Sequence, residues 1–357
     1  AALSMQGREH LVDFVETFSG SHEYVVDYLT GEVLARQTDA QKTFLLQTSI
    51  LDRLCGPLCD AVTGQAGSRQ TLEHLKAANL FIVALDDERR WYRYHRLFAD
   101  LLRQRLMRRQ PDLVTELHRR AGRWLEENGF PFEAIDHLLQ AGDFARAADL
   151  IEDLVKRPTA WSMLNAASLT TWLELLPEQI LQARPHLRLY RARIFTVRGQ
   201  PQTADTILQA LEEELREERP IRPESDTLIE QITADRVSNA ILRGEPLRAI
   251  DYAEQALARL PQENLPARMR LEAILAMACY RVGEIARAGR TYDRAVQAAV
   301  RVIEGVTNPG SVPEDSLNTI LPVVFAVRSW EPESTVINTM VSSGDIALVS
   351  ALSLIHI

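Results

Sequence analysis

Four short segments of the chain share one pattern, a glycine followed five residues later by an alanine. Each copy lies between two stretches in which apolar residues recur at helical spacing. Glycine suits the tight turn that ends a helix, because it adopts positive φ without steric cost. The small alanine lets the next helix pack closely against the one before. A helix–turn–helix unit that recurs along a chain predicts a helical-repeat solenoid, an architecture that generally holds a partner. The four copies are Gly142 with Ala147, Gly199 with Ala204, Gly244 with Ala249, and Gly283 with Ala288.

The last two copies continue with a second small residue. Ala256 and Ala295 follow one heptad after the first alanine, and Pro261 closes the third copy. This spacing resembles the tetratricopeptide repeat, although the glycines lie 57, 45 and 39 residues apart, which is irregular and longer than the roughly 34 residues of that repeat. We therefore predict a TPR-like α-superhelix with long helices over residues 110–303. An unrelated α-helical bundle with a coincidental pattern is the alternative.

The hydrophobic pattern has a different form in the first third of the chain. Apolar residues at helical spacing predict three helices, and an apolar run and an aromatic run then flank a charged turn. Such a pair of runs predicts a β-hairpin, and a further helix follows it. This order predicts a winged-helix domain over residues 39–109. Its predicted helices span residues 40–48, 58–62, 68–78 and 97–109, and its predicted strands span 80–85 and 91–95.

Helical spacing also predicts most of the rest of the chain, so that the expected fold class is mostly α. Thr38 or Asp39 is a suitable cap for the first helix of the winged helix, and Ser68 for the third. The other predicted helices span residues 10–18, 24–36, 114–128, 132–141, 144–155, 161–176, 185–198, 201–216, 226–242, 246–260, 266–282 and 285–303.

The repeat pattern is lost after residue 303. Residues 304–351 contain short apolar runs among Gly, Pro, Ser and Thr, and their structure stays uncertain. Residues 352–357, Leu-Ser-Leu-Ile-His-Ile, match a reading frame of the transposase end used in sequencing libraries. We expect this hexapeptide to be an adaptor artefact, which different codons in the encoding DNA would refute.

Composition excludes several classes of protein. A net charge of -9 argues against a chain that binds nucleic acid over its whole surface. Three cysteines in 357 residues form no disulfide framework, which favours a reducing cytoplasm. No apolar run approaches the length of a membrane span, and no secretory signal sequence opens the chain.

Several motifs, in this order along the chain, resemble the large MalT-type, LuxR-family transcriptional activators, which are signal-transduction ATPases of the STAND class. The resemblance covers about residues 1–300. The segments that carry it are GSHEYVVDYLTGEVLARQ (20–37), FLLQTSILDRLCGPLCDAV (44–62), YRYHRLFADLLRQRL (92–106) and LHRRAGRWLEENGFPFEAIDHLLQAGDFARAADLIE (117–152).

The resemblance implies an order of domains: an NTPase module, a winged helix, a TPR-like superhelix that senses an inducer, and a C-terminal LuxR-type helix-turn-helix. Residues 1–38 would be the C-terminal helices of the NTPase module. No Gly-x4-Gly-Lys-Ser/Thr phosphate loop and no recognisable LuxR helix-turn-helix occur in this sequence. We therefore expect an internal fragment that is not itself an enzyme and holds no cofactor, with ATP or ADP bound upstream. Promoter DNA and RNA polymerase would be partners only of the full-length protein, and the inducer, a small molecule or a protein, would bind the superhelix.

His95 is the one residue to which the resemblance assigns a chemical role. The segment YHRLFADL (94–101) resembles the histidine motif of the STAND winged helix, in which the histidine reaches the diphosphate of ADP. An imidazole can donate a hydrogen bond to phosphate and titrates near neutral pH. A structural histidine at a strand–helix junction is the alternative.

Other clusters have simpler interpretations. Four arginines at the end of the helix over residues 97–109 could contact DNA phosphates, but cations are favourable at any helix C-terminus. Cys55 and Cys59 lack further ligands at zinc-site spacing, so that buried thiols are expected. The acidic run that begins at Glu212 is expected to be a solvated helix end. The arginines are Arg103, Arg105, Arg108 and Arg109.

These observations favour the regulatory and sensor segment of an ATP-dependent LuxR-family regulator, in which the winged helix couples nucleotide state to inducer binding. The alternative is a stand-alone helical-repeat scaffold for protein interaction. A phosphate loop encoded upstream in frame would support the first, and a start codon at the first residue would refute it. No catalytic or metal site is predicted.

Overall fold

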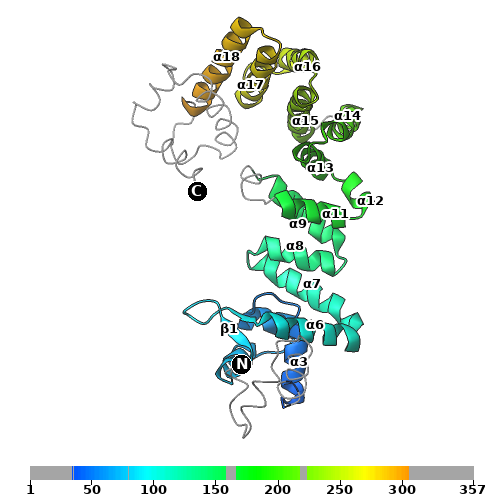
Figure 1. The fold of residues 1–357 in the computed structure, drawn as a ribbon, viewed down its shortest axis with the longest axis vertical. Helices are drawn as coiled ribbons and strands as arrows, with labels where there is room; N and C mark the ends of the chain where they lie inside the picture. The colour runs from blue at the N-terminus through cyan, green and yellow to red at the C-terminus, as the bar shows by residue number, and fades with distance from the viewer. Residues whose placement is uncertain (1–33, 35, 79, 158–165, 218–222, 305–357) are drawn as a thin grey trace, which may run out of the picture. The chain divides into compact units, whose positions relative to one another are not determined.

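The computed structural model of the chain describes residues 34, 36–78, 80–157, 166–217 and 223–304. The contacts divide the chain into two compact units, Ala1–Leu150 and Ile151–Ile357. Among the described residues, the regular structure is α-helical apart from one two-stranded sheet (Figure 1). No helix in these ranges is both long enough and apolar enough to cross a membrane. The predicted mostly α fold, a winged helix followed by TPR-like repeats, is confirmed.

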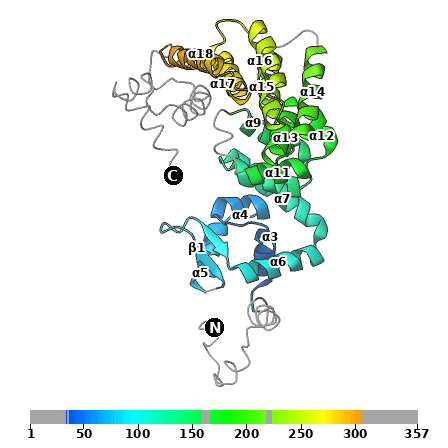
Figure 2. The same cartoon turned by 45° about the horizontal axis from the view of Figure 1, so that its top comes forward.

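The first unit contains the winged helix, in which the helices are grouped round a short hairpin (Figure 2). Its core is built from apolar side chains of all its helices together with the inward residues of the hairpin. Phe98 is fully buried there against Tyr94, whose hydroxyl bonds Thr48 Oγ1 at 2.7 Å. The elements are α3 (Asp39–Thr48), α4 (Gly56–Thr63), α5 (Ser68–Ala77), β1 (Ile82–Ala84), β2 (Tyr92–Tyr94) and α6 (Arg96–Arg109).

The hairpin strands pair antiparallel, with Val83 opposite Arg93. Leu54, between α3 and α4, bonds Tyr92 through both backbone groups, at 2.7 and 2.8 Å. Because the backbone groups of one residue point to the same side of a strand in an antiparallel pair, Leu54 flanks β2 opposite β1. The short strand β2 is therefore fixed on both sides.

The predicted caps of the winged helix have different outcomes. Thr38 caps α3 through a capping box with Gln41, as predicted. The prediction for Ser68 is wrong, because Gly67 is the N-cap residue of α5 and Ser68 is already helical. Asp60 of α4 accepts a hydrogen bond from the Ser68 backbone N–H at 2.8 Å. A carboxylate from a neighbouring helix thus performs the capping that was expected of a serine hydroxyl.

The next helices belong to the same compact unit. Leu117, Ala121 and Leu125 are buried in the core that they share with the winged helix. A Cβ atom added at Gly122 would lie 2.8 Å from Leu138 Cγ, so that α7 and α8 approach closely at this point. The domain boundary at residue 110 stays a prediction, but packing joins α7 and α8 to the winged helix. These helices are α7 (Pro111–Glu127), α8 (Pro131–Gln140) and α9 (Phe144–Val155), which continues across residue 150.

The second unit is a series of helices, most of them in antiparallel pairs (Figure 1). The bounds of the helices from residue 185 on agree with the predicted ones to within three residues. The predicted helix over 161–176 is described only from Ala166, and α12 was not predicted. The helices are α11 (Ala166–Leu175), α12 (Glu178–Gln182), α13 (Pro185–Val197), α14 (Pro201–Glu217), α15 (Pro223–Leu242), α16 (Pro246–Arg259), α17 (Leu265–Arg281) and α18 (Ile285–Glu304).

The Gly–Ala turns share one backbone geometry, and Gly129 with Ala134 is a fifth copy that the sequence analysis missed. The five glycines have φ between +68° and +85°, and the five alanines are at most 2% exposed. At the turn after α15, for example, Glu245 N–H donates to the Ala240 carbonyl at 2.9 Å, which is the long bond of a Schellman motif. Of the second alanines, Ala295 is fully buried and Ala256 half-buried.

Two glycine substitutions should have opposite effects on the stability of the second unit. Gly199→Ala should lower the free energy of unfolding by about 1 kcal/mol, because φ is +75° there and a Cβ is strained in that region. Gly289→Ala lies inside α18 with open space around it, and should raise that free energy by up to about 1 kcal/mol. Urea denaturation of both variants checks the pair of signs. If both variants changed the free energy of unfolding by the same amount and in the same direction, the positive-φ geometry of the Gly199 turn would be contradicted.

A network of charged side chains lies between α14 and α15. Asp205 accepts hydrogen bonds from Arg236 Nε at 3.1 Å and pairs with Arg243 Nη1 at 2.6 Å. Arg236 Nη1 also bonds Glu212 at 2.6 Å, and Arg216 bonds the same carboxylate. The acidic run was therefore predicted wrongly at Glu212, which is 8% exposed and paired with two arginines. Charged residues on a helix are usually solvated, but Glu212 is buried because Arg236 of the facing helix and Arg216 of its own helix both pair with it.

The predictions for residues 10–33, 161–165, 305–351 and 352–357 lie outside the described residues, as does nearly all of the module predicted over 1–38.

Candidate functional site

His95 lies at the junction where β2 ends and α6 begins. It is the N-cap residue of α6, and its side chain makes no capping hydrogen bond. The backbone is fixed, because His95 N–H donates to the Phe81 carbonyl at 2.7 Å and the His95 carbonyl accepts from Phe98 and Ala99. The imidazole itself is exposed. An exposed imidazole on a fixed backbone at a helix N-terminus is suited to bind an anion.

Phe81 supports His95 from one side. Its ring makes an edge contact with the imidazole, with ring centroids 6.4 Å apart, and a second contact with Phe98. Phe81 has φ of +55°, which is uncommon for a bulky residue and costs free energy. The surrounding core therefore holds this segment in a strained conformation next to His95.

The arginines near the end of α6 are not a free cationic cluster. Arg103 donates from Nε to the Ser49 carbonyl and from Nη2 to Asp52, both at 2.7 Å. Arg108 and Arg109 are exposed in the last turn of α6. Arg103 therefore fixes the loop after α3 and is not available for DNA. Cys55 and Cys59 are buried free thiols, as expected, Cys279 is a third one, and burial raises the pKa of each.

Arg53 is the side chain that joins the winged helix to α7 and α8. Its guanidinium lies 4.3 Å from the ring centroid of Trp91 and 4.5 Å from that of Phe130, and it pairs with Glu133 at 2.5 Å. Trp91 and Phe130 also touch edge to face, with centroids 5.6 Å apart, and Phe130 stacks on Trp124. The Arg53 Nε atom is buried without a hydrogen-bond partner. One guanidinium thus connects the start of β2 to the turn between α7 and α8.

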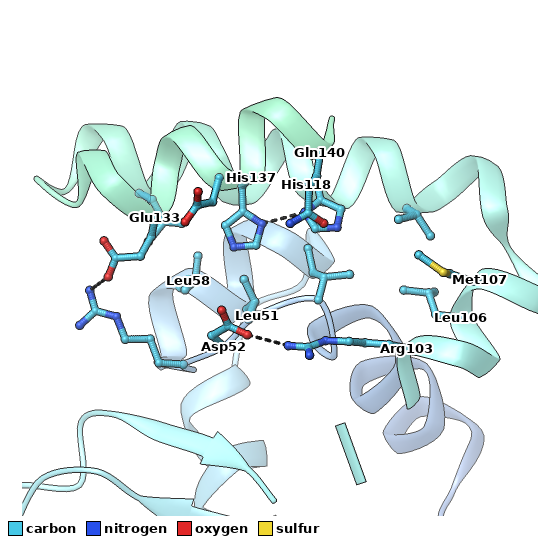
Figure 3. A pocket seen from close by; sticks show the side chains of 15 residues that line it. Leu51, Asp52, Leu58, Arg103, Leu106, Met107, His118, Glu133, His137 and Gln140 are labelled. Carbon is cyan, nitrogen blue, oxygen red and sulfur yellow. Dashed lines mark hydrogen bonds and ion pairs between the residues drawn. The ribbon is translucent and has the colours of Figure 1, made fainter. Parts of the chain in front are cut away.

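A pocket of about 250 Å³ opens beside this joint (Figure 3). Leucines of α4 and α6 form part of its apolar wall, and Asp52 and Arg103 face one another across its lower side. Charges of both signs line it, and the arginines are already paired with carboxylates. The pocket therefore offers little net attraction to an ion.

His118 of α7 and His137 of α8 form a buried pair at the same pocket (Figure 3). Their Nδ1 atoms are 2.8 Å apart, and the residues are 5% and 9% exposed. Since one Nδ1 must carry a proton and the other must not, the two neutral rings need opposite tautomers. Burial lowers the pKa of both from the usual 6.5 to about 4, with a smaller contribution from Arg103 for His118 and from His118 for His137. Both rings are thus neutral at pH 7. The part of the chain that the structure describes contains no group of three or more metal-ligating side chains.

The sequence analysis missed both features of this joint. His118 and His137 lie within the quoted family-like segment and on helices with buried stripes, so that two buried histidines could have been inferred from helical position. Arg53 had no such signal, because its partners are 38, 77 and 80 residues away along the chain. The structure places His95 and the pocket in the same unit and shows no side-chain contact that joins them directly.

Comparison with known proteins gives a match to the first unit and similarity over a longer range. Residues 30–114 match the family model of the MalT winged helix domain. The chain is 34% identical over 279 residues to the serine/threonine-protein kinase PknK of Mycobacterium tuberculosis. The aligned region covers 75% of this chain and 24% of PknK. It is 32% identical over 281 residues to the HTH-type transcriptional regulator MalT of Yersinia enterocolitica. This aligned region covers 78% of this chain and 30% of that regulator. The chain thus spans less than a third of these relatives.

One solved structure with similar helices is a STAND protein with a tetratricopeptide repeat sensor from Pyrococcus horikoshii. It is 13% identical and aligns over 85% of this chain and 46% of its own, with a TM-score of 0.46.

Proposed function

We propose that this chain, whose residues 30–114 match the MalT winged helix, is a regulatory and sensor segment of an ATP-dependent transcriptional regulator. In this proposal the winged helix responds to the nucleotide state of a module outside this sequence, and the helical repeats bind an inducer. The inducer shifts the balance between a closed and an open state, which requires that it bind the two states with different affinity.

The observation that supports this function is the shared core of the winged helix, α7 and α8. Leu117, Ala121 and Leu125 are buried among winged-helix side chains, so that the first helices after the winged helix pack with it as one unit. A change in the position of these helices therefore acts directly on the domain that carries His95. Such a connection is what a sensor that controls a nucleotide site requires.

ATP or ADP is the cofactor implied for the longer protein, and His95 is the residue of this chain that we propose for contact with the nucleotide diphosphate. Promoter DNA and RNA polymerase would be reached through other parts of that protein. The inducer, a small molecule or a protein, would bind the helical repeats in the cytoplasm.

His95→Ala should weaken ADP binding by about tenfold in the protein that carries the nucleotide-binding module, because it removes one hydrogen bond to a charged group. Isothermal titration with ADP measures the effect. His74→Ala, at another exposed histidine of the winged helix, is the matched control and should leave the affinity unchanged. An unchanged affinity in His95→Ala would refute the role of His95.

A second candidate function rests on the similarity to PknK. The same winged helix and helical repeats would then control a serine/threonine protein kinase. The coding sequence upstream and downstream distinguishes the two, since a kinase domain and a DNA-binding domain have different motifs.

A further inference from the structure

We propose that Arg53, Trp91, Phe130 and Glu133 form a latch through which the turn between α7 and α8 holds His95 in position. This inference rests on the proposed function for the meaning of His95, but the latch itself is a property of this unit alone.

The first step is the set of contacts at the two ends of the latch. The Arg53 guanidinium lies 4.3 and 4.5 Å from the centroids of two aromatic rings that meet at 86°, and its ion pair with Glu133 ties it to α8. Cation–π contacts of a partly desolvated guanidinium are favourable. Trp91 belongs to the hairpin, and Phe130 belongs to the turn at Gly129 that joins α7 to α8. The latch thus joins two segments that are distant in sequence.

The second step is the connection from Trp91 to His95. Trp91 directly precedes β2, and Tyr92 is bonded through both backbone groups to Leu54, the residue after Arg53. The other side of β2 pairs with β1. The residue that follows this three-residue strand is His95, whose N–H donates to the Phe81 carbonyl at 2.7 Å. Loss of the Trp91 contacts therefore loosens the hydrogen bonds that hold Tyr92 and His95 in place.

The third step is the modest stability of the latch. The Arg53 Nε atom is buried without a hydrogen-bond partner, and an unpaired buried donor is unfavourable. This cost offsets part of the favourable ring and ion-pair contacts. The contacts of Arg53 with Trp91, Phe130 and Glu133 can therefore open while the unit stays folded. Arg103 continues to bond the Ser49 carbonyl and Asp52 on the other side of the same loop.

Hydrogen exchange of backbone amides in the full 357-residue chain tests the latch. Arg53→Lys keeps the positive charge but loses the planar group that lies against both rings, and Phe130→Leu keeps an apolar side chain in the turn. Each should raise the exchange rates of the Tyr92 and His95 amides at least fivefold. Amides in the middle of α4 and α7 should change less than twofold. Arg90→Ala, which removes an exposed ion pair with Glu88 on the same hairpin, is the matched control and should leave all four regions unchanged.

Two results would overturn the latch. One is a rise of less than fivefold at Tyr92 and His95 in either variant. The other is an equal rise at α4 and α7, which would mean that the variants only destabilise the unit. The double variant adds a further requirement: if both residues act through one contact, its effect at His95 should be smaller than the product of the two single effects.

This test is independent of nucleotide. If the exchange results hold and His95→Ala leaves ADP affinity unchanged, the latch stands and the proposed role of His95 fails. If ADP affinity falls in His95→Ala but the exchange pattern is absent, His95 contacts nucleotide and its position is set in some other way.

Discussion

Acidification from pH 7 to pH 4.5 should lower the free energy of unfolding of the first unit by several kcal/mol. The cause is the buried pair of His118 and His137, whose pKa values are lowered to about 4 in the folded unit. In the unfolded chain both imidazoles titrate near pH 6.5. Between these values the unfolded state binds up to two more protons than the folded state, which corresponds to about 3 kcal/mol per pH unit at most.

Stability falls as the pH falls because the folded unit favours the neutral form of both histidines. The contribution of the pair is complete above pH 6.5, decreases as the pH falls from 6.5 towards 4, and is lost below 4. The charged groups around the pair are Arg103 and Asp52, together with Arg53, Glu133 and Asp136, which also line the pocket. Carboxylates with lowered pKa values, such as Glu116, lose their contribution only at more acidic pH. The histidine window is therefore separate from general acid unfolding.

Urea denaturation at pH 7.5, 6.5, 5.5 and 4.5, followed by tryptophan fluorescence, measures this dependence. The double variant His118→Leu/His137→Leu should lose most of the slope between pH 6.5 and 4.5, because its side chains bind no protons. His74→Gln, at an exposed histidine, should keep the slope. A wild-type chain with constant stability over this window would contradict the buried neutral pair.

Asp205→Ala should destabilise the second unit by about 3–5 kcal/mol. Asp205 is the common partner of Arg236 and Arg243, whose side chains are only 15% and 6% exposed. Removing the carboxylate leaves two partly buried cations without their shared counter-charge, and the loss of this compensation has a larger effect than the loss of one hydrogen bond. Glu212 still pairs with Arg236 and Glu245 still pairs with Arg243, which places the expected value nearer the lower limit.

Hydrogen exchange of α15 amides measures the loss, together with urea denaturation. Glu174→Ala is the matched control, since Glu174 pairs with Arg198 at 2.9 Å but both side chains are about half exposed. That exposed pair should contribute less than about 1 kcal/mol. If the two variants have similar effects, the network between α14 and α15 does not stabilise the unit as the burial of its charges indicates.

The helices and turns of this chain could be predicted from local signals, because those signals lie within a few residues of one another. A glycine at the end of an apolar stripe was sufficient for the turns at Gly199 and Gly244. The helix end at Gly129 was also predicted, but its Gly–Ala spacing was not recognised as a fifth copy of the pattern. It lies only 13 residues before Gly142, so that both ends of α8 carry the motif, whereas the later copies occur once in each helix pair.

The polar contacts could not be predicted, because each depends on residues brought together by packing. The acidic run that contains Glu212 predicts a solvated helix end, but the ion pair with Arg236 on the next helix allows Glu212 to be buried. His118 and His137 bond each other only because α7 and α8 are antiparallel neighbours. The interpretation of Ser68 as a cap was locally reasonable, but Asp60 from another helix provided the oxygen. The role proposed for His95 depended on family resemblance, and its exposure and fixed backbone are new information from the structure.

The close approach at Gly122 limits the motions open to a regulator built in this way. A Cβ at this position would overlap the buried side chain of Leu138, so that the two helices interlock there at the level of single atoms. Shear motion, in which packed helices slide past one another in small steps, requires side chains that can repack. Sliding would bring the glycine away from Leu138 and place the bulkier neighbours of Gly122 against it. The contact between Gly122 and Leu138 therefore opposes sliding of α7 against α8, whereas a change of state that carries both helices together keeps it intact.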